Sequence, residues 1–362
     1  MVSILASAFV SCGREEPQEE YVNDRYFYET LILNSAGYNV IVEFDIVSKS
    51  ARIPCPDPLC DHGEGCLVSH VNRCKTSKNC LYFYKDGGYY AYNPAKNEMN
   101  LIFESGNQVY GPGQGPGNTV YFTVHSYDYD DTGMLVGSGY DVYRYDEQTY
   151  KLEKLNEEKM RNDVRFNECL GDKIFWTFSE GYYTTDLDFK NKTPYSIEEI
   201  SDFEINSRLP YSGTAFECYR KDKETGEKTL VFPPASSYRY ANYERKDAFF
   251  YTPAKLVQYG VDEKTGEPLF AYRPTNTLVY INAYDASDTY TWEFPSGKGG
   301  VTAAFMHADN HREVGDYVAF PYNKVEYDEA GGRHTYGGIF VVNVKTKESF
   351  TLLYEEESHT ID

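Results

Sequence analysis

Cysteine and histidine gather in one short part of this chain. Cys55, Cys60 and Cys66 lie close together, with His62 between the second and the third. Three thiolates and one imidazole are the ligand set of a closed structural zinc site. The spacing is looser than that of a usual zinc knuckle, and Pro56 stiffens the segment between the first two cysteines. One structural zinc is therefore one prediction from these residues, and no cofactor at all is the other.

Disulfide bonds are the competing interpretation and are slightly favoured over a metal, because an exported protein meets an oxidising environment. The cysteines that either chemistry could use, together with His62, are Cys55, Cys60, Cys66, Cys74 and Cys80. Cys169 and Cys218 lie at corresponding ends of adjacent repeats and could form a further disulfide. The five clustered cysteines would leave one unpaired, which favours a metal or a reactive thiol. A metal and a disulfide would both staple the loop at 54–80, so we expect a role in stability rather than in redox chemistry or catalysis.

A second group with metal-binding capacity is formed by His307, Asp309 and His311. Residues at i, i+2 and i+4 of a strand face the same side, so the three side chains could meet a ligand or an ion. They precede the last aromatic strand, where the innermost strand of a repeat is expected. A polar surface loop is the alternative. No recognisable catalytic motif accompanies them, and the sequence assigns no catalytic residue.

The elements that must position these residues are repeated β-hairpins. In each, a strand rich in Tyr, Val and Ile ends near Asp or Asn, and a polar turn and another strand follow. Asn97 and Gly226 suit the positive φ angles that such turns need. The seven hairpins span 38–55, 89–104, 140–155, 182–199, 216–232, 278–294 and 338–354. Aromatic strands precede six of them, at 25–33, 80–85, 119–125, 173–178, 248–253 and 316–322.

Repeats of this kind predict an all-β fold, a single β-propeller of about seven four-stranded blades over 21–362, with six blades as the next choice. A two-domain β-sandwich is the structural alternative, and it predicts no common period. The best helix candidate is the short segment 153–164. The glycine-rich run 111–117 has neither the lysine nor the helix of a phosphate loop, and we expect a stiff connector there.

The N-terminus has the pattern of an export signal. Residues 2–10 are apolar, Ser11-Cys12-Gly13 follows, and 14–20 is polar and acidic. The pattern resembles a bacterial lipoprotein signal, in which the cysteine, here Cys12, is acylated after cleavage. Phe9 and the lack of a preceding basic residue depart from that pattern. We expect 1–20 to be a signal remnant and tether; a buried strand with an ordinary cysteine is the alternative.

Composition limits the partners. The net charge of −21 makes nucleic acid and anionic lipid surfaces poor partners. No internal apolar run approaches the roughly 20 residues that span a bilayer, so contact with a membrane is expected only through a lipid anchor. Tyrosine occurs 36 times, and such rings either fill space between sheets or stack on sugars and peptides.

The segment 53–66 resembles a motif of tyrosine-rich, lipid-anchored β-propeller proteins of anaerobic Firmicutes, which are likened to the TolB propeller. The motif reads Cys55-Pro-Asp-Pro-Leu-Cys60-Asp-His62-Gly-Glu-Gly-Cys66 in this chain. The resemblance implies export and a propeller, and it implies no known reaction.

These observations predict a monomeric, extracellular, membrane-anchored propeller without enzymatic activity. It would bind an unknown protein, peptide or glycan on the disc face or at the channel mouth. A carbohydrate-active enzyme, either a glycoside hydrolase or a polysaccharide lyase, is one alternative. A scaffold or sensor subunit of an envelope complex is another, since one fold hosts many functions.

Overall fold

The computed structural model describes twelve segments of the chain, which contain only β-strands as regular elements, all paired antiparallel. None of these residues belongs to a helix with the length and apolar character that crossing a bilayer requires. The described segments are 25–32, 38–57, 59–104, 108–196, 203–208, 215–221, 225–232, 239–245, 248–285, 287–294, 312–327 and 333–354.

The strands form seven sheets, each built from strands that are close in sequence. Sheet 1 contains β1 (Tyr26–Ile32), β2 (Asn39–Asp45) and β3 (Ser50–Arg52). Sheet 2 contains β4 (Asn72–Thr76), β5 (Leu81–Lys85), β6 (Gly88–Asn93) and β7 (Glu98–Phe103). Sheet 3 contains β8 (Gln108–Gln114), β9 (Thr119–Tyr129), β10 (Leu135–Asp146) and β11 (Lys151–Lys154). Sheet 4 contains β12 (Val164–Leu170), β13 (Lys173–Phe178), β14 (Gly181–Asp186) and β15 (Thr193–Pro194).

The remaining three sheets come from the second half of the chain. Sheet 5 contains β16 (Phe203–Arg208), β17 (Ala215–Lys221) and β18 (Lys228–Phe232). Sheet 6 contains β19 (Arg239–Arg245), β20 (Ala248–Val261), β22 (Thr277–Asn282) and β23 (Thr289–Glu293), and β21 (Pro268–Pro274) pairs with the far part of β20. Sheet 7 contains β24 (Arg312–Val314), β25 (Tyr317–Tyr327), β26 (Arg333–Asn343) and β27 (Ser349–Leu353).

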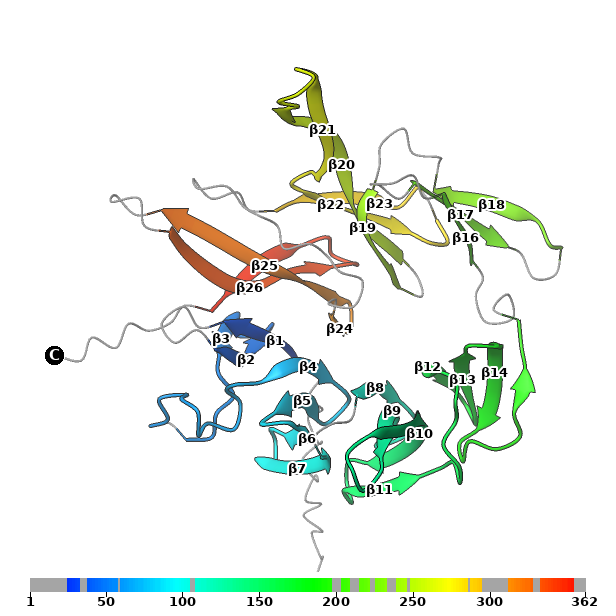
Figure 1. Ribbon diagram of the computed structural model, residues 1–362. Coiled ribbons are helices and arrows are strands. Elements are labelled where there is room, and N and C mark those ends of the chain that lie inside the picture. Colours follow the sequence, from blue (N-terminus) through cyan, green and yellow to red (C-terminus); the bar gives the residue numbers. More distant parts are fainter. Residues whose placement is uncertain are drawn as a thin grey trace, which may run out of the picture.

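The sheets follow one another in chain order around a ring, and the last sheet returns to the first (Figure 1). The strand β1 contacts β4 of the next sheet and β24 and β26 of the last one. In the same way β8 contacts β4 and β12. The first strands of neighbouring sheets therefore lie beside each other, on the inner side of the ring.

The hydrophobic core lies between neighbouring sheets. Tyr121 of sheet 3 packs edge-on against Trp176 of sheet 4, with ring centroids 6.3 Å apart. Phe250 of sheet 6 packs on Phe320 of sheet 7 at 5.5 Å. Aromatic rings, several of them tyrosines, thus fill the space between these sheets.

All seven predicted hairpins are confirmed, and a local signal accounts for most of them. The side-chain oxygen of an Asp or Asn at the end of the first strand accepts hydrogen bonds from backbone N–H groups of the turn that follows. In four of these hairpins the residue four positions after this Asp or Asn has positive φ, namely Lys49, Asn97, Tyr150 and Lys347. The Asx residues with these turn bonds are Asp45, Asn93, Asp146, Asp186, Asn282 and Asn343.

We expect Asp146→Ala to destabilise the protein by about 1 kcal/mol in urea unfolding, because the N–H groups of Gln148 and Thr149 lose their acceptor. The N–H of Thr149, more than any other group, lowers the pKa of the Asp146 carboxyl. A carboxyl whose pKa is lower when folded stabilises above its unfolded pKa of about 3.9, and that stabilisation is lost as pH falls. Asp146→Asn should keep the turn and should reduce the loss of unfolding free energy at low pH. If the unfolding free energy of this variant depends on pH as that of the parent does, the carboxylate of Asp146 does not have this role.

Three sequence expectations are wrong in detail. The helix candidate at 153–164 contains the end of β11, a turn and a bridge between Met160 and Tyr140. The glycine-rich run 111–117, expected as a connector, is partly the strand β8. A Cβ on Gly113 would come within 2.3 Å of the Phe166 ring of sheet 4, so the glycine is required by a contact between sheets. The loop expected at 54–80 is interrupted by β4.

A buried carboxylate joins sheets 2 and 3. Glu147 follows β10 and is 1% exposed. Its carboxylate accepts a hydrogen bond from the hydroxyl of Tyr82 at 2.6 Å and one from the side-chain amide of Asn79 at 3.0 Å. The hydroxyl of Ser77 donates to the same carboxylate. Three donors from sheet 2 thus converge on one acceptor from sheet 3, and every group in this small network has a partner.

Candidate metal centre

The four predicted metal ligands converge in the loop between β3 and β4. Their ligand atoms, three sulfurs and one ring nitrogen, all lie within 4.8 Å of one another. The Sγ atoms of Cys55 and Cys66 are 3.7 Å apart, and Nδ1 of His62 lies 3.6 Å from Sγ of Cys66. The fourth ligand atom belongs to Cys60. The loop therefore brings together the residues that the sequence proposed as one set.

These separations fit a tetrahedral zinc ion. With Zn–S bonds of about 2.3 Å and Zn–N bonds of about 2.0–2.1 Å, tetrahedral angles place two sulfurs about 3.8 Å apart and a sulfur and a nitrogen about 3.6 Å apart. A disulfide would need the sulfurs at about 2.05 Å. The arrangement of Cys55, His62 and Cys66 thus matches the edges of a zinc tetrahedron.

Each sulfur also accepts a hydrogen bond from the backbone N–H two residues further on. The N–H of His62 donates to Sγ of Cys60 at 3.3 Å. The N–H of Asp57 donates to Cys55, and the N–H of Val68 donates to Cys66. Hydrogen bonds to the charged form of an acid stabilise that form, so these N–H groups would support the sulfurs as thiolates once a cation is bound.

Burial sets the protonation of the ligands when no cation is nearby. It raises the pKa of the Cys55 thiol and raises that of Cys66 to about 12, and it lowers the pKa of His62. The imidazole is therefore neutral at neutral pH and can donate an electron pair to a metal. The thiols would become thiolates when a divalent cation supplies the compensating charge.

A buried ammonium group supports the same loop. Nζ of Lys85, on β5, donates to the carbonyls of Ser69 at 2.9 Å and Glu64 at 3.3 Å, on either side of Cys66 in the sequence. A divalent ion with three thiolates and a neutral imidazole has one net negative charge. Lys85, which is 7% exposed, offers a positive charge on the segment that holds Cys66.

The other predicted site residues do not join this cluster. Cys74, on β4, and Cys80, before β5, are buried in hydrophobic clusters, and burial raises the pKa of Cys80. Among the described side chains, all six cysteines are free thiols: Cys55, Cys60, Cys66, Cys74, Cys80 and Cys169. Cys12, the side chain of Cys218, and His307, Asp309 and His311 lie outside the described part of the structure.

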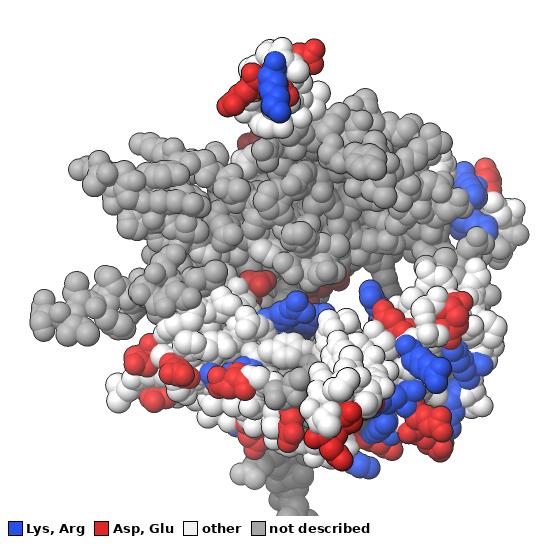
Figure 2. Space-filling model, in the orientation of Figure 1, with Lys and Arg blue, Asp and Glu red and all other residues white. Residues whose placement is uncertain are grey.

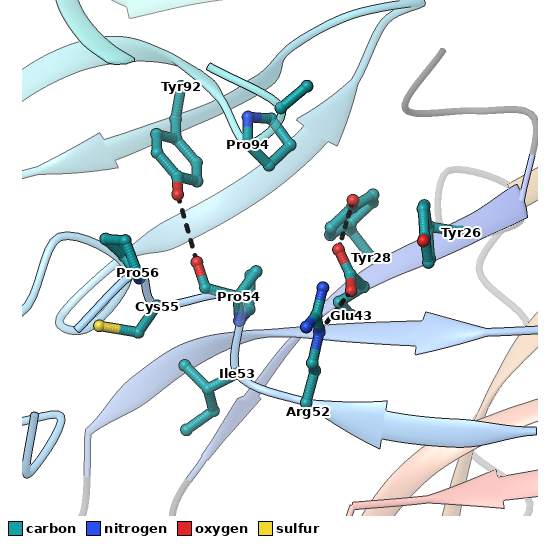
Figure 3. Close-up of a pocket in the computed structure, with 11 residues that line it drawn as sticks. Tyr26, Tyr28, Glu43, Arg52, Ile53, Pro54, Cys55, Pro56, Tyr92 and Pro94 are labelled. Carbon is teal, nitrogen blue, oxygen red and sulfur yellow. Dashed lines mark hydrogen bonds and ion pairs between the residues drawn. The ribbon is translucent and has the colours of Figure 1, made fainter. Parts of the chain in front are cut away.

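A cavity that the sequence did not indicate lies directly beside the metal ligands. It has a volume of about 440 Å³ and lies between sheet 1 and the β6–β7 turn of sheet 2, with Cys55 in its wall (Figure 3). Its lining includes Tyr26, Tyr28, Tyr92 and an ion pair between Glu43 and Arg52. These residues come from distant parts of the chain, and no motif joins them in the sequence.

Fold and site together define an all-β protein of sequential antiparallel sheets with a cluster of three cysteines and one histidine that could hold a metal ion. No family model matches the chain, and a search of curated proteins finds no relative. The chain is similar to the solved structure of oligogalacturonate lyase from Vibrio parahaemolyticus, at 8% identity and a TM-score of 0.40, over 93% of this chain and 91% of that one. It is also similar to the dihydro-heme d1 dehydrogenase NirN, at 10% identity and a TM-score of 0.36, over 92% of this chain and 74% of that one.

A third similar structure is the β-propeller domain of the Trilobed protease from Pyrococcus furiosus, at 9% identity and a TM-score of 0.30, over 93% of this chain and 81% of that one. Such low identities and TM-scores assign no activity to this chain. The case for its function therefore rests on its own residues.

Proposed function

We propose that this chain is a seven-bladed β-propeller that binds a ligand without transforming it chemically. We also propose that one zinc ion stabilises the loop between β3 and β4. The seven sheets, their order around a ring and the cores between neighbouring sheets support the propeller. In this arrangement each sheet is one blade, and the cavity beside Cys55 lies between the first two blades.

The proposed zinc is structural because four protein ligands close its coordination sphere. Catalytic zinc sites keep three protein ligands and leave the fourth position to water or substrate. Here Cys55, Cys60, His62 and Cys66 occupy all four positions. The ion would hold the segment between β3 and β4, and the residues that it fixes include the cavity wall at Cys55.

The single observation that carries the binding function is the composition of the cavity wall. Tyrosines and prolines surround a single ion pair, and Glu43 is the one carboxylate among the lining residues. Glycoside hydrolysis ordinarily requires two carboxylates that flank the bond to be cleaved. The wall therefore offers recognition groups but lacks the acid–base pair of a hydrolase.

We further propose that the protein is exported, anchored through an acylated Cys12, and monomeric. The apolar segment before Cys12 and the acidic tether after it support this proposal. Acidic and basic side chains lie interspersed over the described part of one face (Figure 2). That distribution, with the net charge of −21, favours neutral partners over nucleic acid.

Native mass spectrometry tests the metal staple. We expect an excess mass of one zinc ion, with the three ligand cysteines alkylated only after unfolding. Masses lower by two hydrogens for each bridge, without metal, would instead indicate disulfides.

Binding to arrays of glycans and peptides tests the proposed binding function. If the protein binds no ligand on either array, this function is wrong. Turnover of a polysaccharide that is lost on replacing His307 and His311 by alanine would establish the carbohydrate-active enzyme in its place.

A further inference from the structure

We infer that the cavity between sheets 1 and 2 binds a neutral sugar of roughly one or two rings; this inference rests on the binding function proposed above. Ligand sites for small molecules ordinarily measure about 300–1,000 Å³ and combine apolar walls with a few polar groups. The cavity, at about 440 Å³, has both properties.

The cavity has apolar walls on two sides. In Figure 3, Tyr92, Pro54 and Pro94 lie on one side and Tyr26 and Tyr28 on the other. Tyr28 and Tyr92 are buried, at 1% and 2% exposed, and form the base of these walls, whereas Tyr26 and Pro94 are half-buried and face each other across the cavity. The accessible ring of Tyr26 suits the C–H face of a pyranose ring, which is apolar and flat. Hydrogen bonds fix two of the three tyrosines, since Tyr28 donates to Glu43 at 2.7 Å and Tyr92 to the carbonyl of Pro54 at 3.3 Å.

An ion pair provides the polar contacts. Nε of Arg52 donates to Oε1 of Glu43 at 2.7 Å, and the guanidinium points into the space between the two walls (Figure 3). Glu43 is 4% exposed, whereas the Arg52 side chain is 71% exposed. The guanidinium has two further NH₂ groups for which the described residues show no partner, and each carboxylate oxygen keeps a second lone pair.

Two neighbouring sugar hydroxyls match this pair. Hydroxyl oxygens can accept from the NH₂ groups of Arg52, and their protons can be donated to the carboxylate of Glu43. A hydroxyl both donates and accepts, as an amide does, whereas a carboxylate only accepts and an ammonium group only donates. The arrangement therefore suits a polyol.

Charge favours a neutral ligand over an acidic one. The Glu43–Arg52 pair is neutral as a whole, so it offers donors and acceptors without a net charge that would select an ion. The field of a chain with net charge −21 opposes the approach of an acidic sugar.

The zinc-loaded full chain should be titrated with neutral mono- and disaccharides, galacturonic acid and a proline-rich peptide, with binding followed by calorimetry and saturation-transfer NMR. We expect at least one neutral saccharide to bind, and Arg52→Lys to weaken it at least tenfold. Lysine keeps a positive charge beside the buried Glu43 but lacks the planar guanidinium group with its several N–H donors. Arg165→Lys is the matched control, because Arg165 also pairs with a carboxylate, Asp163, at 2.8 Å but lies on sheet 4.

The outcomes separate the inference from the proposed function. Saccharide binding that Arg52→Lys leaves unchanged would overturn the site. Binding of the peptide or of galacturonic acid that depends on Arg52, without neutral sugar, would overturn the ligand class and leave the binding function intact. If none of the three probe classes binds the folded, zinc-loaded chain, the sugar site is wrong, and the wider arrays then decide the binding function.

Discussion

A Cys66→Ser variant is expected to bind zinc at least about 100-fold more weakly than the parent protein. Cys66 is the most buried of the four proposed ligands, at 4% exposed, and its Sγ lies 3.7 Å from Sγ of Cys55 and 3.6 Å from Nδ1 of His62. A serine hydroxyl is not ionised at neutral pH, so the ion would lose one of three thiolates and one of four bonds. Losing only an outer-shell partner commonly costs a metal site about 10–100-fold in affinity, and the loss of a ligand costs more. Competition with a chromogenic chelator measures the change.

The same substitution should lower the melting temperature. A ligand present at about 100 times its dissociation constant stabilises the folded state by about 2.7 kcal/mol, which corresponds to about 3–4 °C in a protein of this size. Limited proteolysis should then cut between β3 and β4 in the variant and not in the parent. Cys169→Ser is the control, because Cys169 is half-buried on β12 and lies outside the cluster. Equal zinc affinity in the Cys66→Ser and Cys169→Ser variants would remove Cys66 from the ligand set.

Glu147→Ala is expected to destabilise the protein by about 3 kcal/mol or more. The substitution removes the acceptor shared by Ser77, Asn79 and Tyr82. Ser77 can still donate to the carbonyl of Cys80 and Asn79 to Asn118, so the loss falls mainly on the hydroxyl of the buried Tyr82, and a buried donor that loses its acceptor costs about 1–3 kcal/mol. It also opens a void between sheets 2 and 3. Urea unfolding followed by tryptophan fluorescence measures the loss.

Two further variants show whether the network itself is responsible. Glu147→Gln keeps the shape but presents an amide to the donors, so we expect an intermediate loss. Glu157→Ala changes an exposed glutamate in the turn after β11 and should shift the unfolding free energy by less than about 0.5 kcal/mol. A similar small shift for Glu147→Ala would mean that the network contributes little to joining the two sheets.

Local signals explain why the sequence predicted the hairpins. An Asx residue four positions before a residue that tolerates positive φ specifies a tight turn without help from distant residues, as at Asn93 and Asn97. The strand alternation around such turns is equally local. The metal ligands were predictable for the same reason, since Cys55, Cys60, His62 and Cys66 are close in sequence and one loop can bring them together.

Contacts between sheets were decided by tertiary structure. The strand β8 runs through a glycine-rich segment because Phe166 of another sheet packs against Gly113, and no local pattern shows this contact. The aromatic strand missing before the fifth hairpin is β16, whose single aromatic residue, Phe203, gives a weak signal. The carboxylate of Glu147 finds its donors on a different sheet, far away in the chain.

By itself the sequence determined the hairpins, the all-β class and the grouping of Cys55, Cys60, His62 and Cys66, because these depend on residues a few positions apart. Only the tertiary structure decided that Glu43, Arg52 and Tyr92 share one cavity and that Cys55 borders it. The physical reason is that a cavity is the space left between elements. Its walls depend on how whole sheets pack against each other, and packing of distant side chains leaves no period or spacing in the sequence.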